Sequence, residues 1–193
     1  PQILPKTSPN LPKHPPKFAK TLKKIEKLKN SKMLTAILAP GRQNPQMLIK
    51  NLKAKFPKIK YVSVGFGEEE NKLLKLLKEL QLEKEVIFLK NIDQDLKSAL
   101  IAEANLFLMP TRKEKKSVEG FGISFIEAAS YGVASIGGKD GGASDAITHN
   151  ETGLICDGNN FNSIYDSVID FFNNKKFIKL GENSKKFSEK FYW

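Results

Sequence analysis

The stretch VEGFGISFIEAASYGVASIGG, residues 118–138, decides the fold class of this chain. Near its start, Gly120 and Gly122 permit a sharp turn. A helical pattern follows from about residue 123, and the apolar run 133–137 comes after it. The apolar run 105–110 precedes it, and the run GLIC, 153–156, follows it. A strand, a helix and a further strand in succession predict a βαβ unit with parallel strands.

The same alternation extends toward both ends of the chain. Further apolar runs lie at 33–39, 60–64 and 86–89, and helical patterns follow them near 45–55, 68–80 and 94–103. Beyond residue 160 the pattern predicts an amphipathic helix and then a last helix. We therefore expect an α/β fold, namely a Rossmann-like parallel sheet of about six strands with helices on both faces. Six prolines within residues 1–16 predict an extended linker from a preceding domain, which leaves 17–193 as the Rossmann-like domain.

The composition narrows the classes of partner. The formal net charge is +11, yet Arg42 and Arg112 are the only arginines among 32 basic residues. Because base readout and phosphate clamps favour the bidentate guanidinium, we expect lysine-covered surface helices and no nucleic-acid partner. The single cysteine, Cys156, suits a reducing compartment and predicts a cytoplasmic protein. His14 and His149 stand apart from other ligand residues, so we expect no metal site and no cofactor.

The segment KFAKTLKKIEKLKNSK, beginning at residue 17, leaves two interpretations open. Its apolar residues follow a helical stripe among many lysines. Such a helix either packs on the domain with one solvated face or lies on an anionic membrane surface. The second interpretation would place the protein at the inner face of the membrane through a peripheral contact.

Two glutamates, Glu119 and Glu127, flank the glycine turn in the opening stretch. Ligands of open parallel sheets bind beyond the carboxyl ends of the strands, where the start of a helix offers free N–H groups to phosphate. Carboxylates on either side of such a phosphate seat would accept hydrogen bonds from sugar hydroxyls. This arrangement indicates a nucleoside-diphosphate sugar. Alternatively, Glu119 only complements the helix dipole and Glu127 is an exposed helix residue.

The motifs resemble a known family. EGFGISFIEAASYGV, with GGASDAI and ETGLICD after it, resembles the donor-site signature of retaining GT-B glycosyltransferases, which use nucleotide sugars. The lead-in TRKEKKSVEGFG is most similar to the phosphatidylinositol mannosyltransferase subgroup. The resemblance covers about residues 33–193 and implies the carboxyl-terminal, donor-binding half of a GT-B fold. It also implies hexose transfer from a UDP- or GDP-linked sugar to an acceptor lipid, glycan or other molecule, bound mainly by an amino-terminal domain.

The resemblance assigns roles to particular residues of this sequence. It implies that Glu119 contacts the transferred sugar, that Glu127 holds the ribose diol and that Arg42 stabilises the leaving diphosphate. These three residues are all donor-binding positions. The resemblance adds four more, at the base, the sugar and the diphosphate, namely Ile92, Phe121, Gly122 and Ile123. Arg42 and Glu119 are the expected catalytic residues.

One position departs from the family pattern. The family has a phosphate-binding lysine about five residues after its arginine, where this chain has Met47. Lys50 is the first candidate to replace it, and the alternatives are Lys113, Lys115 and Lys116.

Two other functions fit the predicted fold. A nucleotide-sugar epimerase would share the two-domain plan, and it would act on the donor without an acceptor. A non-catalytic dinucleotide-binding module would need the fingerprint G-x-G-x-x-G after the first strand. The segment APGRQNPQM, 39–47, has one glycine and lacks that fingerprint.

Overall fold

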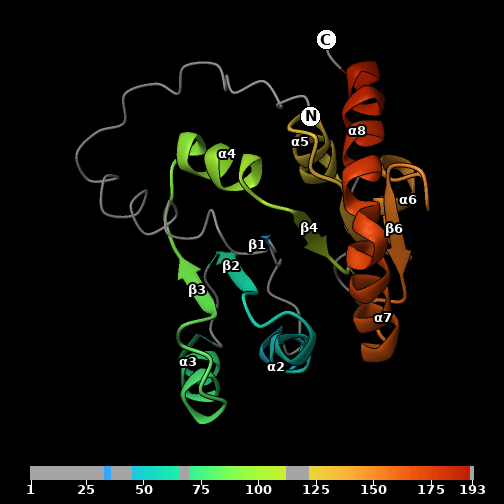
Figure 1. Ribbon diagram of the computed structural model, residues 1–193. Helices are drawn as coiled ribbons and strands as arrows, with labels where there is room; N and C mark the ends of the chain where they lie inside the picture. The colour runs from blue at the N-terminus through green and yellow to red at the C-terminus, as the bar shows by residue number, and fades with distance from the viewer. Residues whose placement is uncertain (1–32, 36–44, 66–69, 112–121, 192–193) are drawn as a thin grey trace, which may run out of the picture.

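The protein forms one parallel sheet covered by helices on both faces. The structure, a computed structural model, describes residues 33–35, 45–65, 70–111 and 122–191 (Figure 1). Six strands lie in the order β3-β2-β1-β4-β5-β6, and each neighbouring pair is parallel. The strands are β1 (Met33–Thr35), β2 (Lys60–Val64), β3 (Val86–Leu89), β4 (Leu106–Met109), β5 (Ser135–Gly138) and β6 (Gly153–Cys156). The α/β class and the parallel sheet predicted from the alternating pattern are confirmed.

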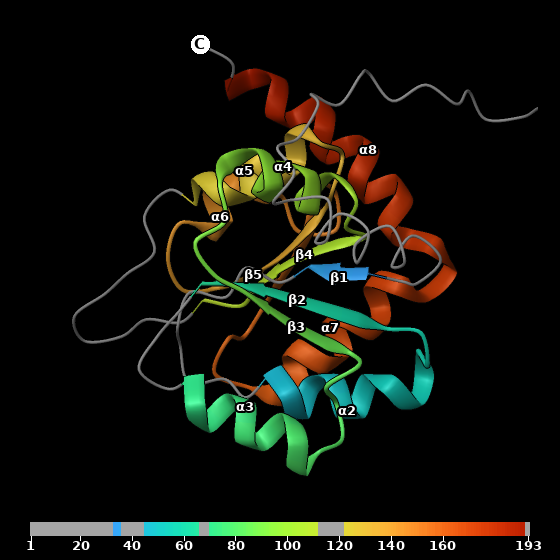
Figure 2. The same ribbon diagram turned by 90° about the vertical axis from the view of Figure 1, so that its left-hand side faces the viewer.

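The helices form one layer on each face of the sheet (Figure 2). One layer holds α2 (Pro45–Lys55), α3 (Glu70–Glu79) and α7 (Phe161–Phe172). The opposite layer holds α4 (Gln94–Ala102), α5 (Ile123–Ser130) and α6 (Ala143–Ala146). The carboxyl-terminal α8 (Lys176–Ser188) contacts α7, β6 and α5 and so passes from the first layer to the second. Two 3-10 turns flank it, η1 (Asn173–Lys175) and η2 (Glu189–Phe191).

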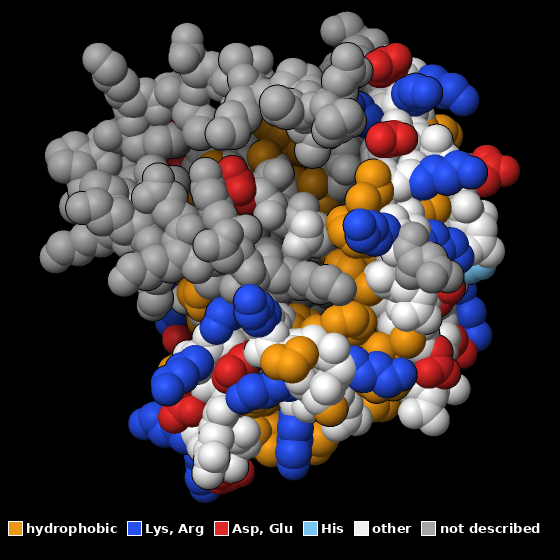
Figure 3. Space-filling model, viewed as in Figure 1, with side chains coloured by type: hydrophobic (Ala, Val, Ile, Leu, Met, Phe, Trp, Pro, Cys, Tyr) orange, Lys and Arg blue, Asp and Glu red, His pale blue; other side chains and the backbone are white. Residues whose placement is uncertain are grey.

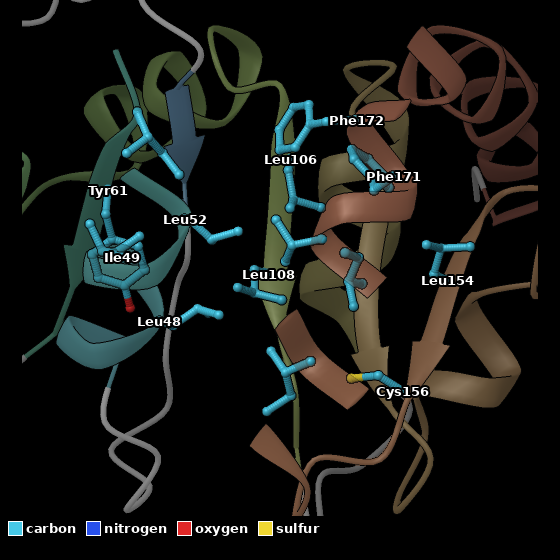
Figure 4. Packing of buried hydrophobic residues seen from close by; sticks show 14 of the residues in the cluster. Leu48, Ile49, Leu52, Tyr61, Leu106, Leu108, Leu154, Cys156, Phe171 and Phe172 are labelled. Carbon is cyan, nitrogen blue, oxygen red and sulfur yellow. The ribbon is translucent and has the colours of Figure 1, made fainter. Parts of the chain in front are cut away.

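The core lies in two apolar layers that share the central strands. Leu106 and Leu108 of β4 join the cluster beneath α2 and α7, whereas Phe107 and Met109 join the cluster beneath α4 and α5. Figure 4 shows Leu106 and Leu108 between side chains of α2 and Phe171 of α7. A strand with helices on both sides is buried on both faces, which explains why NLFLMP reads as a continuous apolar run.

Local backbone contacts shift one strand from its predicted place. The run 133–137 is apolar, but β5 begins at Ser135 because the N–H of Val133 donates to the carbonyl of Ala128 and closes the end of α5. The four-residue helix α6, which lies within GGASDAI, was not among the predicted helices. The strand expected at 33–39 is described over β1 alone, and residues 36–39 lie outside the described ranges.

Charged side chains of both signs are interspersed over the surface of α2 and α3 (Figure 3). Lys53 pairs with Glu85 at 2.9 Å, and Lys75 pairs with Glu79 at 3.9 Å. This part of the surface matches the expectation of solvated, lysine-rich helices. None of the helices described here combines the length and the apolar character that a membrane span requires.

Candidate functional site

The carboxyl ends of the strands meet at one edge of the sheet, where open parallel sheets bind ligands. Three segments leave this edge with defined conformations. Gly65 follows β2 with φ 141°, and Asn91 follows β3 in the left-handed region with φ 47°. Thr111 follows β4, and its hydroxyl donates to the backbone oxygen of Asp140 beyond β5 at 3.1 Å.

The ends of β4 and β5 lie unusually close together. A Cβ atom on Gly138 would lie 1.7 Å from the backbone oxygen of Thr111 and 2.7 Å from its carbonyl carbon. Only glycine permits this approach, because both atoms belong to backbone that cannot rotate away. The start of the segment that leads from β4 toward Glu119 is therefore held against the end of β5.

The helix α5 begins at this same edge. Gly122 is its N-cap, with φ 76° in the left-handed region, and its carbonyl accepts from the N–H of Phe125 at 2.8 Å. A Cβ atom there would lie 2.7 Å from the Phe125 ring and 3.6 Å from the oxygen of Gly142, past the end of β5. Phe125 is buried and packs edge-to-face on Phe107. The glycine is thus required twice, by its conformation and by the ring beneath it.

This helix start has the properties of an anion seat. The first N–H groups of a helix have no intrahelical acceptor, and the dipole makes this end positive. Ile123, the first residue of α5, is 76% exposed, which is unusual for a large apolar side chain. Ile123 therefore offers its side chain to a ligand at the carboxyl edge, whereas Gly122 itself is buried.

Glu127 lies one turn into α5 and is held by two side chains of α4. Its Oε1 accepts from the Gln94 amide at 2.8 Å, and its Oε2 accepts from Lys97 Nζ at 2.5 Å. The side chain of Glu127 is 18% exposed and that of Lys97 is 27% exposed. The interpretation of Glu127 as a freely exposed helix residue is therefore wrong.

Ile92 lies just before α4, two residues from Gln94, which donates to Glu127. Ile92 is half-buried against the second core cluster, between left-handed Asn91 and the N-cap Asp93. The Asp93 carboxylate accepts from the N–H of Leu96 at 2.8 Å and fixes the start of the helix. One turn therefore carries both the expected base contact, Ile92, and the Gln94 partner of Glu127.

The structure places Met47 and Lys50 on α2 without testing their role, and the alternatives Lys113, Lys115 and Lys116 lie outside the described residues. Met47 is 38% exposed in the first turn of α2. Lys50 lies three residues further on and is also exposed, so the two share one side of the helix. Arg42, Glu119 and Phe121 lie outside the described residues. Their predicted roles stay predictions.

Sequence reasoning missed Gln94 and Lys97. Their spacing of three residues marks a common helix side, but it gives no sign of a partner 30 or more positions later in the chain. The parallel topology brings α4 and α5 into the same layer, and this could be known only once the path of the chain was known.

A further ion pair links the segments after β5 and β6. Lys139 Nζ lies 2.7 Å from Asp157 Oδ2. The hydrogen bond from Lys139 and that from the N–H of Asn159 hold the pKa of the Asp157 carboxyl below its usual range. The same Asp157 bond raises the pKa of Lys139. Burial, followed by the charge of Asp157, raises the pKa of the neighbouring Cys156 thiol to about 12, so this thiol is neutral and inert at neutral pH.

Known proteins are similar to this chain in sequence or in fold. A GDP-mannose-dependent alpha-(1-6)-phosphatidylinositol monomannoside mannosyltransferase from Mycobacterium tuberculosis is 38% identical over 111 residues, which make up 56% of this chain and 29% of that protein. The C-terminal domain of a glycosyl transferase group 1 family protein (LpcC) from Francisella tularensis superposes with a TM-score of 0.68 at 20% identity, covering 82% of this chain and 83% of that one. Anabaena Alr3699/HepE, solved in complex with UDP-glucose, superposes with a TM-score of 0.71 at 19% identity, covering 92% of this chain and 49% of that one.

These similarities agree with one another. The chain spans about a third of the length of the curated relatives that it matches. The resemblance to GT-B glycosyltransferases is confirmed for the family and the fold. Residues 17–190, which cover most of the chain, match the family described as "Glycosyl transferases group 1", so the chain belongs to that family.

Proposed function

We propose that this chain is the donor-binding domain of a retaining glycosyltransferase, which transfers a hexose from a nucleoside-diphosphate sugar to an acceptor. The observation that carries the proposal is the placement of Glu127. Its carboxylate is mostly covered, is held by two donors and lies one turn beyond a helix start whose N-cap, Gly122, has no side chain to cap it. A carboxylate beside an anion seat suits a ligand that combines phosphate with vicinal hydroxyls.

Each residue then has a defined task. Glu127 accepts the two ribose hydroxyls, and the backbone at Phe121, Gly122 and Ile123 holds the sugar and diphosphate. By the family resemblance, Glu119 contacts the transferred hexose and Arg42 stabilises the diphosphate as its bond to the sugar breaks. In this proposal the protein lowers the barrier through orientation and electrostatic stabilisation of the leaving group.

The donor and the acceptor belong to the same proposal. The mycobacterial relative is named for GDP-mannose, and the Anabaena protein was solved with UDP-glucose, so GDP- and UDP-linked hexoses are the first candidates. We propose that an amino-terminal domain binds the acceptor mainly, and that the enzyme acts in the cytoplasm or at the inner face of the membrane. The mycobacterial and Francisella proteins described above are named transferases, which gives no support to an epimerase or a non-catalytic module.

Calorimetric titration of the chain with UDP, GDP, ADP and their hexose conjugates tests this proposal. We expect saturable binding of a uridine or guanosine diphosphate and its sugar, with no sugar transferred by this chain alone. Failure of every nucleotide to bind would overturn the donor-site assignment. Conversion of the bound sugar nucleotide to an epimer without acceptor would replace transfer by the alternative activity.

A further inference from the structure

Gln94 and Lys97 form a matched pair of donors, which we call the α4 clamp. They lie three residues apart on α4 and therefore share one side of the helix. The Gln94 amide donates to one oxygen of Glu127, and the Lys97 ammonium donates to the other. Because each oxygen has its own donor, the two bonds together fix the orientation of the carboxylate.

We propose that the α4 clamp makes Glu127 a preformed acceptor for a ribose diol, and that Lys97 is the positioning residue that sets the preference for ribonucleotides. This inference rests on the proposed function, in which Glu127 accepts the ribose hydroxyls. It adds two residues and a source of specificity to that site.

The hydrogen-bonding capacity of the carboxylate fits this role. An ionised carboxylate has two oxygens and about four acceptor positions. The clamp uses one position on Oε1 and one on Oε2. With respect to the described residues, one position on each oxygen is then left for a ligand, which matches the two hydroxyls of a vicinal diol. A clamp that placed both donors on one oxygen would not leave such a symmetric pair.

Burial makes the lysine necessary. The Glu127 side chain is 18% exposed, and a carboxylate covered to this extent needs compensating donors and charge. Without Lys97, Gln94 alone would hold one oxygen, and the other would be free to rotate away from the ligand. A preformed acceptor loses less freedom when the ligand binds, and this strengthens binding.

The matched comparison uses three lysine variants and two pairs of ligands. Lys97→Met removes the charge at similar length, and Lys97→Arg keeps it. Lys53→Met is the control. Lys53 forms a similar ion pair with Glu85, but it lies on α2, in the helix layer opposite α4 and α5. Each protein is titrated with GDP and 2′,3′-dideoxy-GDP, and with the uridine pair, while its melting temperature confirms that it is folded.

We expect Lys97→Met to weaken binding of the ribonucleotide about tenfold, the order expected for a hydrogen bond to a charged group, and to leave the dideoxynucleotide almost unchanged. Lys97→Arg should restore most of the ribose preference, and Lys53→Met should keep all of it. If Lys97→Met does not fold, Gln94→Ala should give a smaller loss of the same preference.

Other outcomes would overturn the inference in distinguishable ways. Equal weakening of both ligands would place Lys97 on the diphosphate or base, and tighter ribonucleotide binding would make the clamp a competitor of the diol. An unchanged ribose preference in Lys97→Met would leave the clamp as a link between α4 and α5 only. If the wild-type chain binds nucleotides without ribose preference, or binds none, the proposed function itself fails.

Discussion

At the end of β5, Gly138 lies so close to Thr111 that a Cβ atom would stand 1.7 Å from the Thr111 backbone oxygen. This contact joins the neighbouring strands β4 and β5 at the edge where the candidate site lies. Because the atoms that meet are backbone atoms, Gly138→Ala must shift the chain at Thr111 or at the end of β5.

The first prediction concerns this contact. We expect Gly138→Ala to lower the free energy of unfolding by about 3 kcal/mol, at the upper end of the range for overpacking. Ser144→Ala, an exposed change on nearby α6, should change it by less than about 0.5 kcal/mol. Urea unfolding followed by circular dichroism measures both. An alanine variant as stable as the wild type would contradict the close approach.

The second prediction concerns the thiol of Cys156. Burial raises its pKa to about 12, so at pH 8 the thiolate fraction should be on the order of one in ten thousand. A thiol reagent should therefore label the native chain slowly and the urea-unfolded chain rapidly. Stoichiometric labelling of the native chain within seconds would mean that the thiol is accessible and ionised.

The third prediction concerns the Lys139–Asp157 pair. Because the pKa of Asp157 is lowered in the folded state, the stability that it contributes is present above its unfolded pKa and lost as the pH falls through the folded value. Asp157→Asn should therefore be less stable than the wild type at pH 7, and the difference should vanish in strong acid. Unfolding curves at a series of pH values give this difference. A gap that grows toward low pH would contradict the assigned sign.

The fourth prediction concerns the phosphate contact on α2. If Met47 leaves a gap where the family has a lysine, Met47→Lys should tighten binding of a nucleoside diphosphate and steepen its dependence on salt. Lys50→Met is the matched test of the first substitute. Unchanged binding in Met47→Lys together with a clear loss in Lys50→Met would assign the contact to Lys50.

The sequence predicted those features that depend on neighbouring residues. Apolar runs such as GLIC, 153–156, and the pattern from Phe161 onward correspond to β6 and α7 at their observed bounds. The start of α5 was placed correctly from its glycine turn. Each of these signals is local, because strand and helix patterns are set by residues within a few positions of one another.

Features that depend on distant contacts could not be read in this way. The bond from Lys97 to Glu127 spans 30 positions and depends on two helices lying in one layer. The need for glycine at Gly138 arises from the approach of Thr111, which no pattern around residue 138 reveals. Val133 belongs to an apolar run, but a backbone bond to Ala128 keeps it out of the strand.

The most direct test of the account compares Glu127→Ala with the wild type by calorimetry, using GDP and UDP beside their 2′,3′-dideoxy analogues. If Glu127 accepts the ribose diol, the mutation should weaken ribonucleotide binding by about 1.5–3 kcal/mol, the range for hydrogen bonds to charged groups. It should leave dideoxynucleotide binding nearly unchanged. Equal losses for both ligands would contradict the ribose assignment, and with it the donor site proposed here.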